Sequence, residues 1–228
     1  MRSNIKEALM AAKVPTGWYD ISVPLKQGMN YLPIDPVAPK IYRLADVALG
    51  SKVTMSMLEI ISHTGTHIDT PLHFIPGGST VSDMPLDATI GPARVIEIKD
   101  PEKVKVSELE KHKIKKGQRI LCKTRNSPVA YESPRFVEDY VYLDADAAVY
   151  LAEKGIILFG LDCITIGDIK NEESVIKTHQ SLLSAGIYIM EGCALGHVPQ
   201  GEYEMLCLPL LMYHGDAGPC RAILRPLK

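Results

Sequence analysis

The sequence lacks a long apolar run, a block of like charge and a recognisable secretory leader, and each absence argues against a class of protein. Its richest apolar stretches, residues 156–161 and 205–212, are much shorter than the roughly 20 residues of a membrane-spanning helix. The net charge is -2 and no basic block is present, whereas nucleic-acid binding usually needs clustered positive charge. The apolar patch near the N-terminus is too short for a signal peptide. We therefore expect neither a membrane nor a nucleic acid as a partner.

Aromatic residues are few, and the cysteines show no pairing pattern. Trp18 is the single tryptophan. The five cysteines are widely spaced, odd in number and include no Cys-x-x-Cys pair, which is typical of a reduced intracellular protein. Four of them lie in apolar, strand-like sequence, so we predict buried thiols and a cytoplasmic location. Cys163, which follows Asp162, is a candidate nucleophile that this interpretation disfavours.

The length of 228 residues suits one large domain or two small ones. No repeat or low-complexity linker divides the chain, so we predict a single domain over residues 1–228, with residues 1–16 as a helical extension. Apolar runs and turn residues predict strands at residues 20–25, 53–62, 93–98, 119–123, 156–161, 187–190, 203–212 and 220–224. Helices are predicted at residues 107–111, 145–154 and 174–185, and a proline-rich loop at residues 33–39.

The helix-to-strand links predict an α/β fold with a mixed, partly parallel sheet. Two local signals are the clearest. Residues 145–154 begin after Asp144 and end at Gly155, which is the usual position of a C-capping glycine. Residues 53–62 alternate apolar and polar side chains, as a half-buried strand does. The polar segment that follows this strand is then expected to be a loop.

That segment, residues 62–74, contains three histidines and an aspartate with the spacing His-x3-His-x-Asp-x3-His. The four residues are His63, His67, Asp69 and His73. Imidazole and carboxylate are ligands that zinc and similar divalent metals prefer. Gly65 and Pro71 interrupt the segment, so two histidines on one helix face do not explain the spacing. We therefore predict a metal site.

Further polar residues follow apolar strands or face their ends. Asp162 is either a cleft residue or a turn and cap acceptor. Glu191 directly follows residues 187–190, and a carboxylate there is costly to bury unless it is paired or metal-bound. His179 lies on the helix predicted at residues 174–185, where a histidine is more often at the surface. His214 either lines a pocket or serves a turn.

Residues 63–74 resemble the signature HxGTHxDxPxHF of the cyclase family of metal-dependent hydrolases, whose members include bacterial kynurenine formamidases and isatin hydrolases. The resemblance extends to residues 18–22, 159–162, 179–192, 203–210 and 219–225. It implies a swivelling β/β/α fold with a mixed sheet or barrel-like core and few helices. It also implies assembly as a homodimer or homotetramer.

The resemblance assigns roles residue by residue. His63, His67 and Asp69 match the family's ligands of a first metal, and Asp69, His179 and Glu191 those of a second. His73 matches the general acid/base. Trp18 matches the residue that contacts the aromatic ring of a small-molecule substrate. One or two divalent ions are implied, with zinc favoured over manganese.

The implied reaction is the cleavage of an aryl formamide, such as N-formylkynurenine, into formate and an aromatic amine by metal-activated water. Two alternatives stay open, namely the opening of a cyclic amide or lactone and a non-catalytic metal- or ligand-binding protein. The intact His73 argues against the second alternative, because a binding protein needs no proton carrier. Residues 31–36 depart from the family's formamidase pattern, so the substrate is the least determined part of the prediction.

Overall fold

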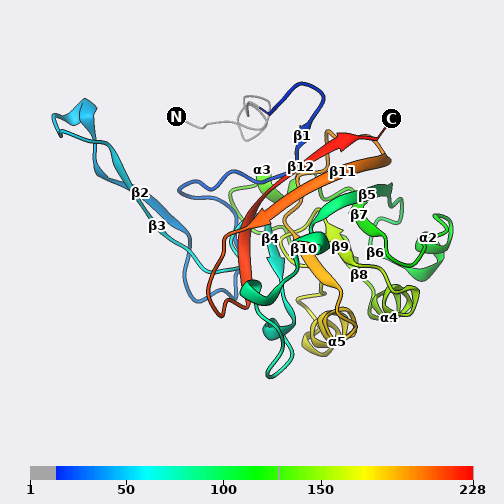
Figure 1. Cartoon of the computed structure of the whole chain (residues 1–228). Coiled ribbons are helices and arrows are strands. Elements are labelled where there is room, and N and C mark those ends of the chain that lie inside the picture. Colours follow the sequence, from blue (N-terminus) through cyan, green and yellow to red (C-terminus); the bar gives the residue numbers. More distant parts are fainter. Residues whose placement is uncertain (1–13, 128, 228) are drawn as a thin grey trace.

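The computed structural model describes residues 14–127 and 129–227, and its centre is a closed barrel (Figure 1). The main sheet has the strand order β1-β12-β11-β5-β7-β9-β10-β4, and a further pairing of β12 with β4 closes seven of these strands into a ring. The strands are β1 (Tyr19–Asp20), β4 (His67–Asp69), β5 (Ile90–Glu97), β7 (Arg119–Lys123), β9 (Leu158–Leu161), β10 (Tyr188–Glu191), β11 (Gly201–Pro209) and β12 (Ala217–Pro226). The barrel-like mixed sheet predicted from the sequence is confirmed.

Two layers of apolar side chains hold the barrel together, one inside it and one outside. Along β7, Leu121 belongs to the inner cluster, while its neighbours Ile120 and Cys122 belong to the outer one. This alternation follows from the two-residue period of a strand. The outer cluster is covered by α4 (Ala145–Lys154) and α5 (Glu172–Leu183), which lie side by side in Figure 1. Both sheet faces are thus buried, as a parallel stretch requires.

The parallel stretch contains β5, β7, β9 and β10, and the remaining barrel pairings are antiparallel. Several predicted elements are confirmed. Helix α4 starts after Asp144 and ends at Gly155, whose φ of 65° is the left-handed conformation that glycine adopts at low cost. Shorter elements are α2 (Val106–Glu110), α3 (Val129–Glu132), β6 (Lys103–Val104), β8 (Tyr142–Leu143) and the 3-10 turns η1 (Val47–Leu49), η2 (Pro71–His73), η3 (Val81–Asp83) and η4 (Leu86–Ala88).

The prediction of a half-buried strand at residues 53–62 is wrong. β3 (Met55–Glu59) pairs only with β2 (Lys40–Ala45), and all five of its residues are exposed. Residues 40–59 form a two-stranded arm that extends far from the barrel (Figure 1). The alternation of side chains was correctly recognised, but no layer formed by residues 14–127 and 129–227 covers either face of the arm.

The loop predicted for the histidine segment is also corrected in part. His67 and Asp69 lie on β4, a strand of the barrel, and His73 lies in η2. Of the helical extension predicted for residues 1–16, only residues 14–16 fall in the described part, and these are not helical. Over the described ranges, no helix combines the length and apolar character that a membrane crossing requires.

Candidate active site

A close backbone contact brings the histidine segment against the end of β10. Gly65 and Gly192 both have φ near 70°, and a Cβ on Gly192 would lie 2.4 Å from the carbonyl oxygen of Gly65. Only glycine fits such an approach. Thr66 strengthens the contact, because its hydroxyl donates to the carbonyl of Gly192 at 2.6 Å and accepts from the amide of Val23 at 2.8 Å. Glu191, one residue before Gly192, is thereby held beside the segment.

Strand β4 lies between β10 and β12, and both neighbours contribute side chains to the site. In the β4–β10 ladder, His67 is opposite Glu191, and in the β4–β12 ladder Asp69 is opposite Ala217. His179 comes from α5, which packs outside the barrel, and it is only 2 % exposed. Four residues predicted from two distant segments of the sequence thus meet where α5 lies beside β4 and β10.

The ligand-type atoms of these residues converge. His63 Nδ1 lies 3.0 Å from Asp69 Oδ1, and His67 Nε2 lies 3.3 Å from the same oxygen. On the other side, Glu191 Oε2 is 3.3 Å from His67 Nε2, and its Oε1 is 3.4 Å from His179 Nε2. A single connected cluster therefore contains all five metal ligands that the sequence predicts.

Backbone carbonyls orient two of the imidazoles. His67 Nδ1 is 3.0 Å from the carbonyl oxygen of Gly65, and His179 Nδ1 is 2.8 Å from that of Val175. Because a carbonyl only accepts, Nδ1 must carry the hydrogen in each ring. In the neutral rings this leaves the lone pair on Nε2, which faces the carboxylates. Histidines that bind metals are usually oriented in this way.

The same residues are electrostatically unsatisfied without a cation. His67 and Asp69 are completely buried, and within the described structure His67 Nε2 and both oxygens of Asp69 make no well-formed hydrogen bond. Lone pairs of a neutral His67 and of Asp69 would face each other, which is unfavourable unless a positive charge lies between them. The donor set of imidazole nitrogens and carboxylate oxygens therefore fits a divalent metal.

The pKa values of the histidines point the same way. Burial lowers the pKa of His63, but the hydrogen bond to Asp216 and the nearby carboxylate of Asp69 outweigh this effect and raise it to about 9. Burial likewise lowers the pKa of His67, and the charge and hydrogen bond of Asp69 raise it well above its ordinary value. Without metal, the imidazoles take up protons to balance the carboxylates. Metal binding must displace these protons, so it weakens in acid.

His73 lies at the open side of the cluster. Its ring centroid is 4.0 Å from that of His63, and its Nδ1 is 3.7 Å from Asp216 Oδ2. The side chain is 27 % exposed, against 0 % for His67. This position suits a group that exchanges protons with a substrate. His73 also lies close enough to Asp69 and His179 to form a metal-binding triad with them, so the ligand alternative remains.

Asp216 is a site residue that the sequence analysis missed. Its Oδ2 lies 2.8 Å from His63 Nε2, and its Oδ1 accepts a hydrogen bond from the hydroxyl of Ser62 at 3.0 Å. Hydrogen bonds to His63 and His73 hold the pKa of the Asp216 carboxyl well below its usual range. When Asp216 accepts a hydrogen bond from His63 Nε2, the lone pair of the neutral ring is on Nδ1, which faces Asp69. Metal binding needs this orientation of the ring.

The remaining candidates lie outside the cluster. Asp162 is a cap acceptor, because it accepts from Thr124 N at 2.9 Å, from Thr124 Oγ1 at 2.8 Å and from Ser127 N at 3.2 Å. His214 is exposed, and its ring contacts Tyr213. Cys163 is buried, which raises its pKa and opposes a role as nucleophile. The ring of Trp18 lies 4.9 Å from the guanidinium of Arg225, and Trp18 lines neither cavity described below.

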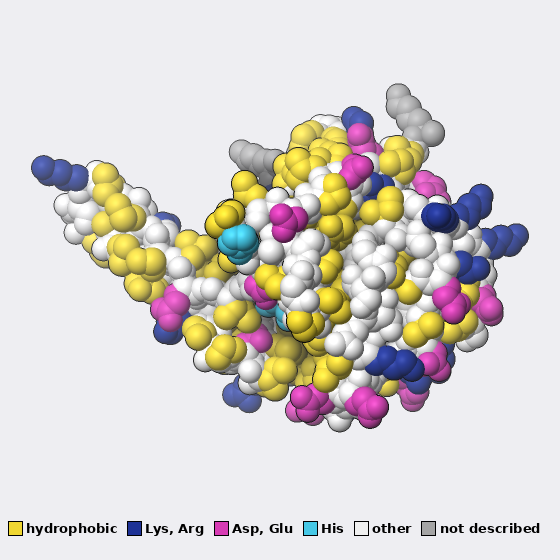
Figure 2. Space-filling model, turned by 60° about the horizontal axis from the view of Figure 1, so that its bottom comes forward, with side chains coloured by type: hydrophobic (Ala, Val, Ile, Leu, Met, Phe, Trp, Pro, Cys, Tyr) yellow, Lys and Arg dark blue, Asp and Glu magenta, His cyan; other side chains and the backbone are white. Residues whose placement is uncertain are grey.

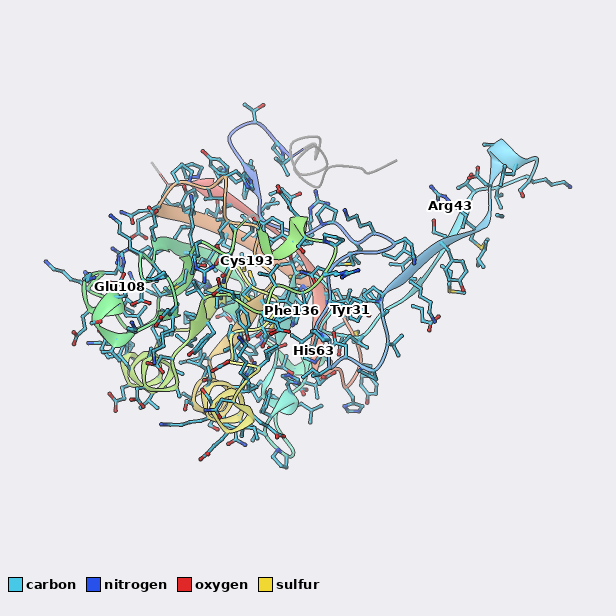
Figure 3. All side chains as sticks on the ribbon, turned by 180° about the vertical axis from the view of Figure 1, so that it is seen from behind. Tyr31, Arg43, His63, Glu108, Phe136 and Cys193 are labelled. Carbon is cyan, nitrogen blue, oxygen red and sulfur yellow. The ribbon has the colours of Figure 1, made fainter. Side chains whose placement is uncertain are left out.

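The cluster opens into a cavity of about 190 Å³. Its walls contain His63, His73, His179 and Glu191 on one side, and apolar side chains that include Phe74 and Ile164. Leu32, Ile34 and Asp35 from the loop at residues 31–36 also line it. The part of the sequence that departs from the family pattern therefore lies beside the cluster. Figure 3 shows Tyr31, His63 and Phe136 close together in the middle of the molecule.

The comparisons agree with this geometry. Residues 19–168 match the model of the family described as "Putative cyclase". The chain belongs to this family. The family recognised in the signature at residues 63–74 is thereby confirmed.

Relatives cover nearly the whole chain. A kynurenine formamidase from Bacillus thuringiensis is 36 % identical over 92 % of this chain and 98 % of its own length. A structure described as a potential metal-dependent hydrolase with cyclase activity is 31 % identical, covers 92 % of this chain and 98 % of its own, and has a TM-score of 0.79. Isatin hydrolase A from Labrenzia aggregata covers 92 % of this chain and 94 % of its own with a TM-score of 0.75, but at 19 % identity it is similar in fold alone.

Proposed function

We propose that the protein is a metal-dependent arylformamidase that hydrolyses N-formylkynurenine to formate and an aromatic amine. The observation that supports this most directly is that the unsatisfied atoms of the buried His67 and Asp69 lie beside Glu191, which lines a cavity together with the partly exposed His73. A pure storage site would not need a partly exposed imidazole beside the ligands. The relatives named kynurenine formamidase supply the choice of substrate class.

His63, His67 and Asp69 would hold one metal, and Asp69, His179 and Glu191 a second. The set contains nitrogen and oxygen donors only, so zinc is the first choice and manganese the second. Asp69 lies within reach of both sets, because a carboxylate oxygen of Asp69 is within 4.8 Å of ligand atoms of His63 and His67 and also of His179, so the chain would hold one or two ions. Asp216 would keep His63 oriented in either case.

When bound, the metal supplies a water that is deprotonated near neutral pH and a positive charge beside the carbonyl oxygen of the amide. The chain's residues supply the remainder. The apolar walls at Phe74 and Ile164 exclude bulk water, which strengthens electrostatic interactions in the cavity. His73 donates a proton to the departing amine nitrogen, and the carboxylate of Asp216, whose Oδ2 lies 3.7 Å from His73 Nδ1, favours the protonated imidazole.

Removal of metal should therefore abolish most of the turnover. We expect a chelator such as dipicolinate to eliminate formanilide and N-formylkynurenine hydrolysis, and added zinc or manganese to restore it. Formate release measures the activity, and elemental analysis before and after chelation gives the identity and number of ions. Opening of isatin without cleavage of either formamide would identify the cyclic-amide hydrolase instead. Bound metal with no turnover of any of the three compounds would identify the binding protein.

We also propose that the chain assembles with itself, as a homodimer or a homotetramer. The arm at residues 40–59 is an isolated two-stranded hairpin, which is at best marginally stable in water by itself. Figure 2 shows its hydrophobic side chains at the surface. The exposed ones are Tyr42, Leu44, Val47, Leu49, Val53, Met55, Met57 and Leu58. Such a patch usually marks an interface.

We propose that the surface that covers the arm belongs to a second copy of this chain. The barrel has an open groove of about 580 Å³ that is lined mainly by apolar side chains, including Val23, Leu25, Leu208 and Leu210. Docking each arm in the groove of the other copy would bury both patches with two-fold symmetry. Trp18 lines none of the cavities described for its own chain. We propose that its predicted contact is with a substrate ring bound by another copy of the chain.

Introducing a charge on the arm should break this assembly. We expect Leu44→Asp combined with Met57→Asp to give a particle of about the chain mass of 25.1 kDa in light scattering, and the unaltered protein to give twice or four times that mass. Leu86→Asp, at an exposed apolar residue in η4, is the matched control and should leave the mass unchanged. A monomeric unaltered protein would disprove the assembly.

The cytoplasm is the compartment that we propose for the protein. All five cysteines are free thiols, and four of them are buried. A reducing environment keeps such thiols unpaired.

A further inference from the structure

A second cavity adjoins the one at the histidine cluster. It measures about 240 Å³, and its walls include Arg125, Phe136, Val137, Asp139, Tyr140 and Ile164. Ile164 also lines the cavity of about 190 Å³ that contains His63, His73 and Glu191. One side chain thus borders both spaces, and a ligand that passes Ile164 would reach from the histidines to Arg125.

Arg125 and Asp139 form a charged pair at the wall of this second cavity. Arg125 Nη2 donates to Asp139 Oδ1 at 2.6 Å, its Nη1 donates to the carbonyl of Asp139 at 3.1 Å, and its Nε donates to the carbonyl of Pro101 at 2.7 Å. A guanidinium has five N–H groups. These bonds use one N–H of each nitrogen, so Nη1 and Nη2 each keep one more donor. The side chains are 42 % and 88 % exposed, so the pair can exchange partners with a ligand.

The backbone around Arg125 is held firmly, although the side chain is exposed. Thr124 donates to Asp162 through its amide and its hydroxyl, at 2.9 Å and 2.8 Å. The side chain of Asn126 exchanges two hydrogen bonds with the backbone of Val141, each 2.7 Å long. An ion pair this exposed contributes little to stability. Stability is therefore a poor explanation for placing a fixed guanidinium and a carboxylate together at a cavity wall.

We propose that Arg125 and Asp139 bind the α-amino-acid end of the substrate, with the carboxylate on Arg125 and the ammonium on Asp139. This assignment rests on the proposed hydrolysis of N-formylkynurenine. That molecule carries its formamide on an aromatic ring and an ammonium and a carboxylate on one carbon of its side chain. Both charges of such a zwitterion match a guanidinium and a carboxylate that lie side by side, and a planar guanidinium holds a carboxylate with two parallel bonds.

The space between the two ends suits the rest of this molecule. Phe136 lines the second cavity, and Tyr31 lines a narrow space that also includes His63 and Ile164. The two spaces share Ile164, and Tyr31, His63 and Phe136 are labelled in Figure 3. An aryl ring between these aromatic side chains would place its formamide at the histidines and its charged side chain at Arg125. A plain formanilide would fill the first cavity only, because it has no charged end.

The test compares two substrates with metal-loaded enzyme. We expect Arg125→Met to raise the KM for N-formylkynurenine about tenfold or more, which corresponds to one charge-assisted contact, and to leave formanilide turnover unchanged. Asp139→Asn should act in the same direction. Arg125→Lys keeps the positive charge but loses the two parallel hydrogen bonds of a guanidinium, so it should give a smaller rise in KM. Arg94→Met is the matched control, because Arg94 pairs with Glu202 and does not line either cavity.

A binding measurement without turnover separates this proposal from the proposed function. Calorimetry should show that kynurenine, the amino-acid product, binds the unaltered protein more tightly than 2-aminoacetophenone, and that Arg125→Met removes the difference. Equal effects of Arg125→Met on both formamides, or no effect on either, would overturn the subsite while the arylformamidase stands. Binding of kynurenine that depends on Arg125 without hydrolysis of any formamide would overturn the activity and retain the subsite. If kynurenine binding does not depend on Arg125 and no formamide is hydrolysed, both the subsite and the arylformamidase activity would be overturned.

Discussion

We expect the Asp69→Asn variant to lose its metal and to fall about 10³-fold in kcat/KM. Asp69 Oδ1 lies 3.0 Å from His63 Nδ1 and 3.3 Å from His67 Nε2, and its carboxylate is completely buried. An amide keeps the shape but removes the negative charge that a divalent cation needs. Loss of an outer partner of a metal ligand costs about 10–100-fold in affinity, so loss of the ligand itself should cost more. A bound metal stabilises the charge of the transition state by several kcal/mol, and the loss of this stabilisation corresponds to the expected loss of rate.

The unfolding temperature distinguishes a lost ligand from a lost fold. Metal at 100 times its dissociation constant stabilises a protein by about 2.7 kcal/mol. We expect zinc to raise the unfolding temperature of the unaltered protein and not that of Asp69→Asn. Once the carboxylate is gone, His63 and His67 can release their protons, so no unpaired charge stays buried, and the metal-free temperature should shift by only a few degrees. Asp146→Asn, at an exposed pair with Lys177, is the control and should respond to zinc normally. An Asp69→Asn protein with full metal and turnover would show that Asp69 is not a ligand.

The sequence predicted the candidate site residues that can be recognised from their neighbours in the chain. His63, His67 and Asp69 lie within seven positions, so their spacing alone indicates a shared ligand. Glu191 was recognisable because a carboxylate directly after an apolar strand is costly to bury without a partner. His179 was harder, since a helical histidine is usually exposed. Its burial comes from the stacking of Phe74 on its ring, with centroids 4.4 Å apart, a contact between residues that are distant in sequence.

Asp216 shows why the remainder could not be predicted. It lies 147 positions beyond Asp69, in a turn with no motif of its own. The pairing of β12 with β4, with Ala217 opposite Asp69, brings it to His63. This pairing closes the barrel, and a strand's own pattern does not identify its partner. His214, two residues earlier, was the candidate that the sequence indicated, but its side chain is exposed.

The prediction of a half-buried strand at residues 53–62 is wrong for a related reason. Alternating apolar and polar residues indicate that one face of a strand will be covered, but not by which molecule. The part of the chain that the structure describes provides no cover for residues 53–62, and β3 is exposed along its whole length. The second cavity was equally beyond the sequence, because it joins Arg125 and Asp139 to Ile164. These residues belong to different loops that only the folded barrel brings together.

The second large effect is expected for His73→Ala, which should lower kcat about 10²- to 10⁴-fold while the metal content stays unchanged. His73 is the most exposed imidazole of the cluster, and it lines the same cavity as His63 and Glu191. Without a proton donor, the amine leaves slowly and the tetrahedral intermediate returns to the substrate. Steady-state turnover and elemental analysis on the same sample measure both quantities. His214→Ala is the matched control and should retain full activity, since its ring lies on Tyr213 at the surface.

The leaving group decides between the two roles of His73. An electron-withdrawing ring substituent makes the departing amine less dependent on protonation, so the loss caused by His73→Ala should be smaller for 4-nitroformanilide than for formanilide. A metal ligand would behave differently, because His73 can also join Asp69 and His179 in a triad. In that case the variant would lose metal, and the loss of rate would be similar for both anilides. Full turnover with full metal content would exclude either role and leave the departing amine to be protonated by solvent.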